Sequence, residues 1–289
     1  MTRKALSTLL AASKPLVLPG VHDALSAKLA TEAGFEAVFV SGFGLSASLL
    51  GEPDFGFIGA TDALDAARRI VASTTAAVIV DIDTGYGNPF HVEKTVQGLI
   101  DARAGGCFLE DQAWPKRCGH MEQKRVVDVD EYLPKLRAAV AVRGDAPFHV
   151  TARTDARAML GLEEAIRRAR LYAEAGADAI FVEAPQSLEE MATIRASLPA
   201  DVVLVANMVE AGKTPLRSAK ELGDAGFGIA LWPVTGLLAA AKAMREAYGA
   251  LRRDGTSEAV SDRLLRFAEI NEITGLPERY AREKAWLRG

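Results

Sequence analysis

Two aspartates that follow a β-branched run are the residues of this chain best suited to chemistry. The run Val78–Val80 is continuously apolar, as in a strand buried on both faces of a parallel sheet, and Asp81 and Asp83 come next. In extended backbone, carboxylates two residues apart point to the same side. They repel each other unless a cation lies between them, and a hard divalent ion prefers such oxygen ligands. The alternative is that one aspartate caps the following helix and the other is solvated.

Several other predicted strands also end in polar or acidic residues. Active sites of (β/α)8 barrels lie at the carboxyl ends of the strands, so these side chains are expected on one rim. A single one is more typical of a helix cap or a solvated charge, but their recurrence at successive strand ends favours a site. They are Ser41-Gly42-Phe43-Gly44, whose backbone N–H groups are suited to an anion, Glu110, Asp111, Arg153, Asp155, Glu183 and Asn207. Asp54 follows the second strand in the loop Gly51–Gly56.

The loop from Gln112 to Val127 carries the second reactive group. Loops of this length without secondary structure are usually lids or disordered segments. Cys118 lies beside two basic residues and precedes His120 by two positions. An electropositive setting favours the thiolate near neutral pH, so this thiol is suited to exchange a proton with a carbon centre. The alternative role of a small buried hydrophobe fits Cys107 better, and one Cys with one His does not complete a zinc site.

The elements that must position these residues alternate regularly. Eight short apolar runs are each followed by an alanine-rich amphipathic segment, which favours a (β/α)8 TIM barrel; an open doubly wound sheet is the alternative, although it needs no particular strand number. The predicted strands are Leu16–Leu18, Ala37–Val40, Ala77–Asp81, Cys107–Glu110, Phe148–Ala152, Ala179–Glu183, Val202–Ala206 and Phe227–Leu231. The predicted helices are Asp23–Ala33, Thr61–Ala72, Pro89–Ala104, Asp130–Val142, Leu162–Ala175, Ser187–Ser197, Pro215–Leu222 and Pro233–Arg252. Glycines that follow the helices, such as Gly34, Gly105, Gly176 and Gly226, are predicted helix stops.

A helical extension follows the predicted barrel. We expect residues 1–253 to form the catalytic barrel and residues 254–289 to form a C-terminal extension with helices over Ser257–Thr274 and Pro277–Arg288. A closed barrel does not need these helices, so we expect them to pack on a partner subunit. Packing on their own barrel is the alternative.

Composition limits the class of protein. The chain has 289 residues, a net charge of −4 and a pI near 5.7, with acidic and basic residues interspersed. This pattern does not suggest binding to nucleic acid or to an anionic membrane surface. The first residues lack the apolar core of a signal peptide, and no apolar run approaches the ~20 residues of a membrane span. With two cysteines only, we expect a cytoplasmic protein with free thiols.

These motifs together resemble the isocitrate lyase/phosphoenolpyruvate mutase superfamily over nearly the whole chain. The lid motif Lys116–His120 is typical of its carbon–carbon lyase branch, and Leu49–Gly56 and Trp114–Met121 are most similar to the 2,3-dimethylmalate lyases and the plant petal death protein. The other motifs that carry the resemblance are Ser41–Gly44, Asp81–Gly87, Glu110–Gln112, Ala152–Asp155, Asn207 and Gly212–Leu216.

The resemblance implies a helix-swapped barrel that assembles as a homotetramer, a dimer of dimers. It implies Mg2+, or Mn2+ in its place, at Asp81 and Asp83, with Asp54 and Glu110 completing the shell largely through water. The substrate-binding residues implied are Ser41, Gly42, Phe43, Gly119, Arg153, Asn207 and Thr214. The catalytic residues implied are Cys118, which would protonate the departing carbanion, with Arg153, Glu183 and His120.

The implied reaction is the cleavage of a 2-alkylmalate-type 2-hydroxy dicarboxylate, such as 2,3-dimethylmalate, to pyruvate and a short carboxylate. Phe39 and Phe108 replace polar residues of the isocitrate and methylisocitrate lyases, so a third carboxylate is not expected in the substrate. Pro233 stands where oxaloacetate hydrolases tend to carry serine. The alternatives are an oxaloacetate hydrolase or decarboxylase, a methylisocitrate lyase, and a non-catalytic barrel that binds a small acid.

Overall fold

The computed structural model describes residues 3–12, 15–119 and 124–288. By their internal contacts the residues form two compact units, Met1–Thr235 and Gly236–Gly289. The boundary predicted at residue 253 assigns helix α11 (Thr235–Asp254) to the barrel, whereas the contacts group almost all of that helix with the C-terminal residues. Among the described helices, none combines the length and the apolar character that a bilayer crossing requires.

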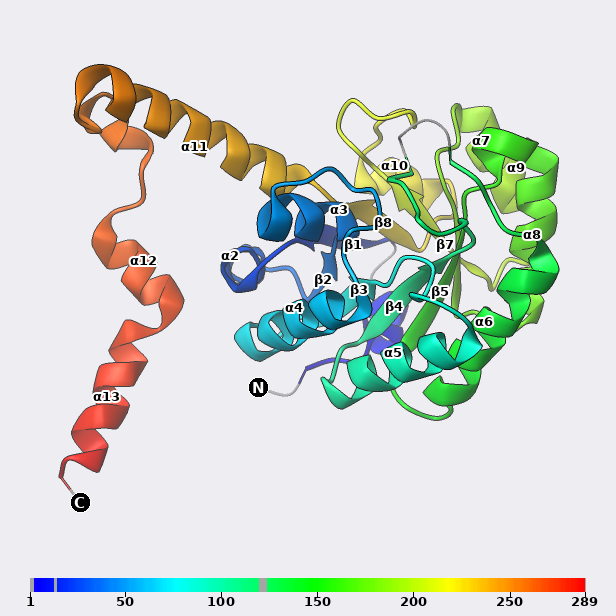
Figure 1. Cartoon of the computed structure of the whole chain (residues 1–289), viewed down its shortest axis with the longest axis horizontal. Coiled ribbons are helices and arrows are strands. Elements are labelled where there is room, and N and C mark those ends of the chain that lie inside the picture. Colours follow the sequence, from blue (N-terminus) through cyan, green and yellow to red (C-terminus); the bar gives the residue numbers. More distant parts are fainter. Residues whose placement is uncertain (1–2, 13–14, 120–123, 289) are drawn as a thin grey trace. The chain divides into compact units, whose positions relative to one another are not determined.

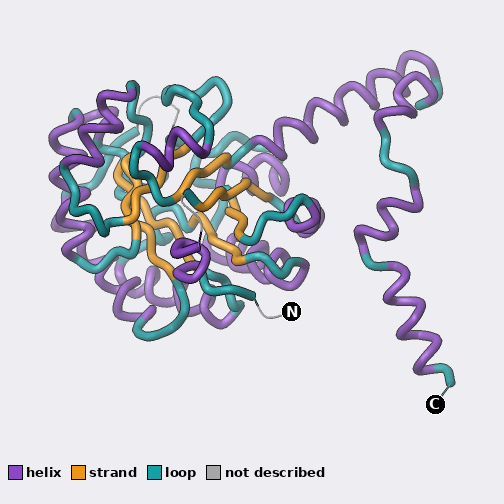
Figure 2. Tube along the Cα trace, turned by 180° about the vertical axis from the view of Figure 1, so that it is seen from behind, coloured by secondary structure: helices purple, strands orange, loops and turns teal. Residues whose placement is uncertain are grey.

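The first unit is a closed barrel of eight parallel strands, as predicted. The strands pair in sequence order and β8 pairs with β1, so the sheet has no edge. Figure 1 shows the helices around the strands, and Figure 2 shows the same arrangement from behind. The strands are β1 (Leu16–Val21), β2 (Ala37–Val40), β3 (Ala77–Asp81), β4 (Gly106–Glu110), β5 (His149–Thr154), β6 (Ala179–Val182), β7 (Val203–Asn207) and β8 (Ile229–Trp232).

The helices of the first unit agree with the predicted pattern, with a few differences. They are α1 (Leu6–Ala12), α2 (Ala24–Glu32), α3 (Gly42–Leu45), the π-helical turn η1 (Ser46–Leu50), α4 (Ala60–Ser73), α5 (Pro89–Asp101), α6 (Val129–Arg143), α7 (Arg157–Leu160), α8 (Leu162–Glu174), α9 (Leu188–Ala196) and α10 (Ala219–Asp224). Helix α10 begins four residues later than predicted, because the Ser218 hydroxyl accepts the Glu221 N–H and caps the helix there. Helices α1, α3 and α7 were not predicted.

Alternate residues of each strand face the inside of the barrel. The interior cluster includes Leu18 of β1, Phe39 of β2, Ile79 of β3 and Phe108 of β4, all buried. The intervening residues, such as Val78, pack against the helices in a second cluster. Continuing this two-residue period to the carboxyl ends directs the last inward side chains into the mouth of the barrel. These are Ser41, Asp81, Glu110, Arg153, Glu183 and Asn207.

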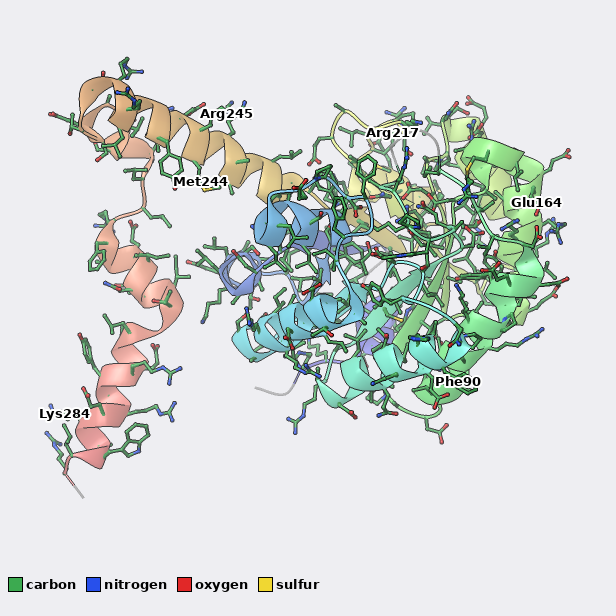
Figure 3. All side chains as sticks on the ribbon, in the orientation of Figure 1. Phe90, Glu164, Arg217, Met244, Arg245 and Lys284 are labelled. Carbon is green, nitrogen blue, oxygen red and sulfur yellow. The ribbon has the colours of Figure 1, made fainter. Side chains whose placement is uncertain are left out.

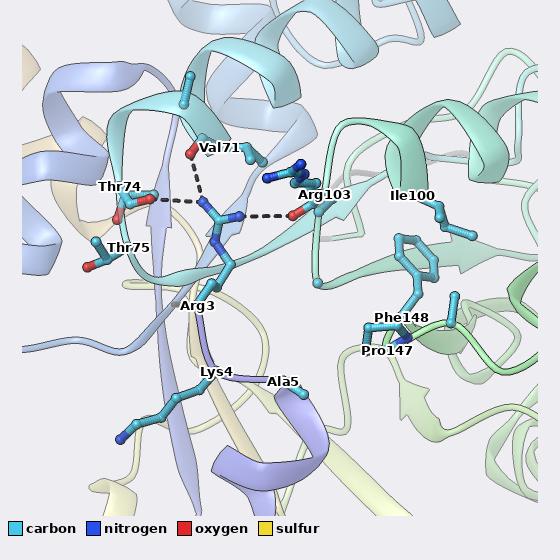
Figure 4. A pocket seen from close by; sticks show the side chains of 14 residues that line it. Arg3, Lys4, Ala5, Val71, Thr74, Thr75, Ile100, Arg103, Pro147 and Phe148 are labelled. Carbon is cyan, nitrogen blue, oxygen red and sulfur yellow. Dashed lines mark hydrogen bonds between the residues drawn. The ribbon is translucent and has the colours of Figure 1, made fainter. Parts of the chain in front are cut away.

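The opposite end of the barrel is closed by the N-terminal segment. Leu6 and Leu9 of α1 are each 2% exposed and belong to the interior cluster. Just before them, the Arg3 guanidinium donates hydrogen bonds to the carbonyl oxygens of Val71 and Thr74 at the end of α4 and of Arg103 after α5 (Figure 4). Helix C-termini carry partial negative charge, so this arginine fixes the segment to both helices.

Arg3 also lines a cavity of about 750 Å³ on this side of the barrel. The pKa of Arg3 is lowered by burial and by the nearby Arg103. Because the Arg3 guanidinium is already occupied by backbone carbonyls, we interpret Arg3 as a structural clamp.

Three of the predicted glycine stops, Gly34, Gly176 and Gly226, adopt positive φ. After α5, Arg103 adopts positive φ, at 61°, instead of Gly105.

The second unit contains α11, a 3-10 turn η2 (Glu258–Arg263), α12 (Phe267–Thr274) and α13 (Leu276–Trp286). The single helix predicted over Ser257–Thr274 is wrong, because Glu269 accepts the Arg266 backbone N–H and starts a new helix at Phe267. Large apolar side chains of this unit are exposed in the single chain, among them Phe267 at 82%, Trp286 at 70% and Met244 at 48%. Figure 3 labels Met244 on α11. Packing of this unit on a partner stays a prediction.

His149 provides a test of the barrel interior. It begins β5, faces inward, is 8% exposed, and its Nδ1 atom has no hydrogen-bond partner among the described residues. Burial lowers its pKa from 6.5 to about 4; Asp178 opposes this effect and Arg143 adds to it. Between pH 6.5 and 4, the folded chain therefore keeps the imidazole neutral, while the same imidazole in the unfolded chain takes up a proton.

We predict that the contribution of neutral His149 to the free energy of unfolding is fully present above pH 6.5 and falls as the pH drops from 6.5 to 4. The loss is about 3 kcal/mol across that window. In His149→Gln, urea unfolding midpoints measured from pH 7 to 4.5 should fall less steeply than in the unsubstituted protein, whereas substitution of the exposed His91 by Gln should not change the slope. Equal slopes in the His149 variant and the unsubstituted protein would exclude this role.

Candidate active site

Arg153 lies at the centre of the side chains that meet at the barrel mouth. Its Nη1 is 3.2 Å from Glu110 Oε2, its Nη2 is 3.2 Å from Glu183 Oε2, and its Nε donates to Asp155 Oδ2 at 2.9 Å. Asn207 Nδ2 lies 3.3 Å from the same Glu183 oxygen. The structure therefore brings together the predicted residues at the ends of four consecutive strands.

The side chains of Asp81 and Asp83 point to the same side, as predicted, but the backbone at Asp83 is not extended. Strand β3 ends at Asp81, and Asp83 sits in a turn with φ 49° in which its N–H donates to Asp81 Oδ1 at 3.1 Å. A Cβ atom added to Gly42 would lie 3.0 Å from Asp81 Oδ2 and 3.1 Å from Asp83 Oδ1, so both carboxylates converge on this glycine. Helix α5 is capped by Asn88, and both aspartates are buried, which rules out the capped and solvated alternative.

Lys116 is the residue that the sequence analysis missed. Its ammonium is 3% exposed and lies 2.7 Å from Asp54 Oδ1 and 2.7 Å from Asp83 Oδ1. It was considered only as a basic neighbour of the lid thiol. The sequence shows a lysine in a loop that follows several acidic strand ends, but no sequence pattern indicates that its side chain points into the barrel mouth.

Carboxylate charge in this cluster exceeds what the nearby cations balance. Burial raises the pKa of Asp83 to about 7, together with repulsion from Asp81 and Asp54 and against the effect of Lys116. Burial likewise holds the pKa of Glu110 well above its usual value, although Arg153 opposes this. Glu110 Oε1 is buried and has no hydrogen-bond partner among the described residues.

The residues present fit a hard divalent cation. Oxygen donors, surplus negative charge and the unpaired Glu110 Oε1 are what Mg2+ requires. Within residues 3–12, 15–119 and 124–288, no three His, Cys, Asp or Glu side chains are already arranged as a ligand group. The set Asp81, Asp83, Asp54 and Glu110 thus stays a prediction that the geometry supports.

The predicted anion-binding turn is a short helix. Ser41 caps α3 by accepting the Gly44 N–H through its hydroxyl at 3.2 Å, and the Gly42 N–H points to Asp81 Oδ2 at 3.3 Å. Phe43 lies in the same turn. Thr214 is 3% exposed and its hydroxyl has no hydrogen-bond partner among the described residues; the same holds for Asn207 Oδ1. Both atoms remain available to a ligand.

Two described residues of the predicted lid loop contact the loop after η1. The Cys118 N–H donates to the Asp54 carbonyl at 3.2 Å, and the Arg117 guanidinium lies 5.0 Å from the centre of the Phe55 ring. Cys118 is partly exposed, and a Cβ added to Gly119 would lie 2.5 Å from Arg153 Nη2. A side chain at position 119 would therefore displace the end of the Arg153 side chain. His120, also predicted to be catalytic, lies outside the described residues.

An aromatic floor lies beneath these polar groups. The rings of Phe39 and Phe108 are 4.8 Å apart, and those of Phe108 and Phe181 are 5.8 Å apart. The Arg153 guanidinium is 5.3 Å from the centre of the Phe181 ring. The floor offers no charged partner, so a ligand must place its carboxylates toward the rim.

Comparison with known proteins agrees with this geometry. The phosphoenolpyruvate phosphomutase family model matches residues 6–252. The petal death protein of Dianthus caryophyllus is 45% identical over 269 residues, which cover 93% of this chain and 84% of that protein. The 2,3-dimethylmalate lyase of Eubacterium barkeri is 42% identical over 275 residues, covering 95% and 94%.

Solved structures extend the comparison. An oxaloacetate acetylhydrolase in complex with 3,3-difluorooxalacetate superposes with a TM-score of 0.92 at 38% identity, covering 98% of this chain and 96% of that one. A phosphonopyruvate hydrolase in complex with oxalate and Mg2+ superposes with a TM-score of 0.89 at 33% identity, covering 99% and 100%. This chain therefore belongs to the phosphoenolpyruvate phosphomutase family, within the PEP mutase/isocitrate lyase superfamily.

Proposed function

We propose that this protein is a Mg2+-dependent carbon–carbon lyase that cleaves a 2-alkylmalate-type 2-hydroxy dicarboxylate, such as 2,3-dimethylmalate, to pyruvate and a short carboxylate. The observation that carries the proposal is the buried carboxylate cluster of Asp54, Asp81, Asp83 and Glu110, beside Arg153 and beneath a loop that bears a thiol. The similarity to 2,3-dimethylmalate lyase supports the choice of substrate class. We infer a cytoplasmic location from the composition.

Asp81 and Asp83 would hold the Mg2+ ion, which would supply the Lewis acidity that favours ionisation of the substrate hydroxyl. Lys116 offsets the negative charge of Asp54 and Asp83, and so links the lid loop to the metal site.

Residues of the chain then bind the substrate, supply a proton and exclude water. Arg153 orients the 2-oxo acid carboxylate, with Asn207 and the Ser41–Phe43 turn beside it. As the C2–C3 bond breaks, its electron pair moves to C3 and the Cys118 thiol donates the proton that C3 needs. The hydroxyl proton passes to a carboxylate of the site, and the electrons of the O–H bond form the new carbonyl. The Cys118 thiolate takes up a proton before the next turnover. Gly119 brings the loop against Arg153, which excludes water from the developing carbanion.

An oxaloacetate hydrolase is the second candidate, because the chain superposes closely on an oxaloacetate acetylhydrolase. Methylisocitrate, which carries a third carboxylate, is disfavoured by the aromatic floor of Phe39, Phe108 and Phe181.

A substrate panel tests the proposed function. With Mg2+ present, we expect pyruvate from 2,3-dimethylmalate or 2-methylmalate, and little product from methylisocitrate. Chromatographic detection of pyruvate, oxalate and acetate separates the candidates. Oxalate and acetate from oxaloacetate as the main activity would replace the lyase by the hydrolase, and no product from any member of the panel would favour a non-catalytic acid-binding barrel.

Cys118→Ser tests the proton donor. Because a serine hydroxyl is a far weaker acid than a thiol, we expect turnover to fall by about 10²- to 10⁴-fold. Binding of oxalate with Mg2+, measured by calorimetry, should persist. Cys107→Ala is the matched control, since this buried cysteine faces the helices and not the site. Turnover near the unsubstituted rate in Cys118→Ser would remove Cys118 from the mechanism.

The C-terminal unit provides a test of assembly. We propose that the exposed apolar residues of α12 and α13, such as Phe267 and Trp286, pack on a partner subunit in a homotetramer of helix-swapped dimers. Deleting residues 255–289 should reduce the particle mass measured by light scattering while the barrel keeps its circular dichroism. An unchanged mass would show that the extension does not hold the assembly together.

A further inference from the structure

Lys124 has a buried ammonium group that the proposed reaction does not use. The residue is 7% exposed, and its Nζ lies 2.9 Å from Asp155 Oδ1 and donates a hydrogen bond to the Gly119 carbonyl oxygen. Removing an ammonium from water is costly unless it is fully paired. Lys124 therefore joins two fixed partners, one on the barrel and one in the lid loop.

The barrel partner is itself held rigidly. Asp155 is 0% exposed, and its Oδ1 accepts from Arg153 Nη2 at 3.1 Å as well as from Lys124. Its backbone N–H donates to Asp111 Oδ1 at 2.9 Å. Asp111 Oδ2 in turn accepts from Thr154, Arg168 and Tyr172 at 2.7 to 2.9 Å. Asp155 is thus a fixed point set by helix α8 and strand β5.

The lid partner touches the reacting groups. A Cβ on Gly119 would lie 2.5 Å from both Arg153 Nη2 and Glu183 Oε2, so the Gly119 backbone rests on this ion pair. Cys118 is the next residue along the chain. A shift of Gly119 therefore moves the thiol relative to Arg153.

We propose that Lys124 is a positioning residue: by joining the Gly119 carbonyl to Asp155, it holds the Cys118 thiol in register with Arg153 and Glu183. The proposal rests on the proposed function only in taking Cys118 as the proton donor. Its geometric content, that Lys124 sets the position of Cys118, is independent of the substrate.

The first test measures the position of the thiol without turnover. Oxalate with Mg2+ at saturating concentration should protect Cys118 from alkylation by iodoacetamide in the unsubstituted protein, read by mass spectrometry of the Cys118 peptide. In Lys124→Met, we expect alkylation in the presence of oxalate and Mg2+ to proceed at the ligand-free rate. Protection equal to that of the unsubstituted protein would overturn the proposal, whatever the substrate proves to be.

Lys135→Met is the matched control. Lys135 is also a buried lysine, at 8% exposure, but it lies on α6 and its pKa is lowered by burial. Both its ligand protection and its turnover should remain as in the unsubstituted protein. If Lys124→Met does not fold, Lys124→Arg, which keeps the positive charge beside Asp155, should retain at least part of the protection; its complete loss in a folded Lys124→Arg with an intact Asp155 pair would overturn the proposal.

The second test separates positioning from stability. With the best substrate of the panel, we expect the kcat of Lys124→Ala to be lower by about 100-fold, with a smaller change in KM. A decrease of this size is expected when a catalytic group, here the Cys118 thiol, is misplaced by about 1 Å. Added n-propylammonium, which replaces the missing part of the side chain, should restore part of kcat. A drop in kcat that follows only the loss of folded protein, without rescue by the amine, would assign Lys124 a purely structural role.

Discussion

A surplus of buried carboxylate charge at the mouth of the barrel is the constraint on which the rest of this structure depends. Asp54, Asp81, Asp83 and Glu110 are buried, and the cations that pair with members of this set among the described residues are Lys116 and Arg153. Arg153 is shared with other acids. Such a cluster costs free energy in the folded protein, because burial and mutual repulsion both oppose ionisation. We infer that the cluster is retained, despite this unfavourable free energy, because it binds a cation and the anionic ligand of that cation.

The barrel supplies the rigidity that this arrangement needs. Every strand is paired on both sides, and the middle of the interior is filled by apolar side chains, so the last inward residue of each strand has a fixed place. Helix α1 fills the opposite end, and Arg3 fixes it to α4 and α5. The buried carboxylates are thereby gathered at one end of the barrel, where the loops after the strands reach over them. The lid loop then contributes both an ammonium, from Lys116, and a thiol, from Cys118, from positions only two residues apart.

Much of this could be predicted from the sequence, for a physical reason. Strands buried on both faces give continuous apolar runs, so the eight strands, and the acids at their ends, were predictable. The i, i+2 argument for Asp81 and Asp83 led to the correct neighbours although Asp83 lies in a left-handed turn. The inward position of Lys116 was not predictable, because a lysine in a polar loop carries no signal of burial. Helix α1 was missed because seven residues are too few to show a period, and its burial depends on the barrel it closes.

The most direct measurement of the central claim is a titration of the metal-free protein with Mn2+, followed by electron paramagnetic resonance. We predict one bound Mn2+ per chain, displaced by excess Mg2+ and lost in Asp83→Asn, with oxalate changing the spectrum of the bound ion. No bound Mn2+, or the same binding in Asp83→Asn as in the unsubstituted protein, would contradict a divalent cation at this cluster and with it the lyase mechanism.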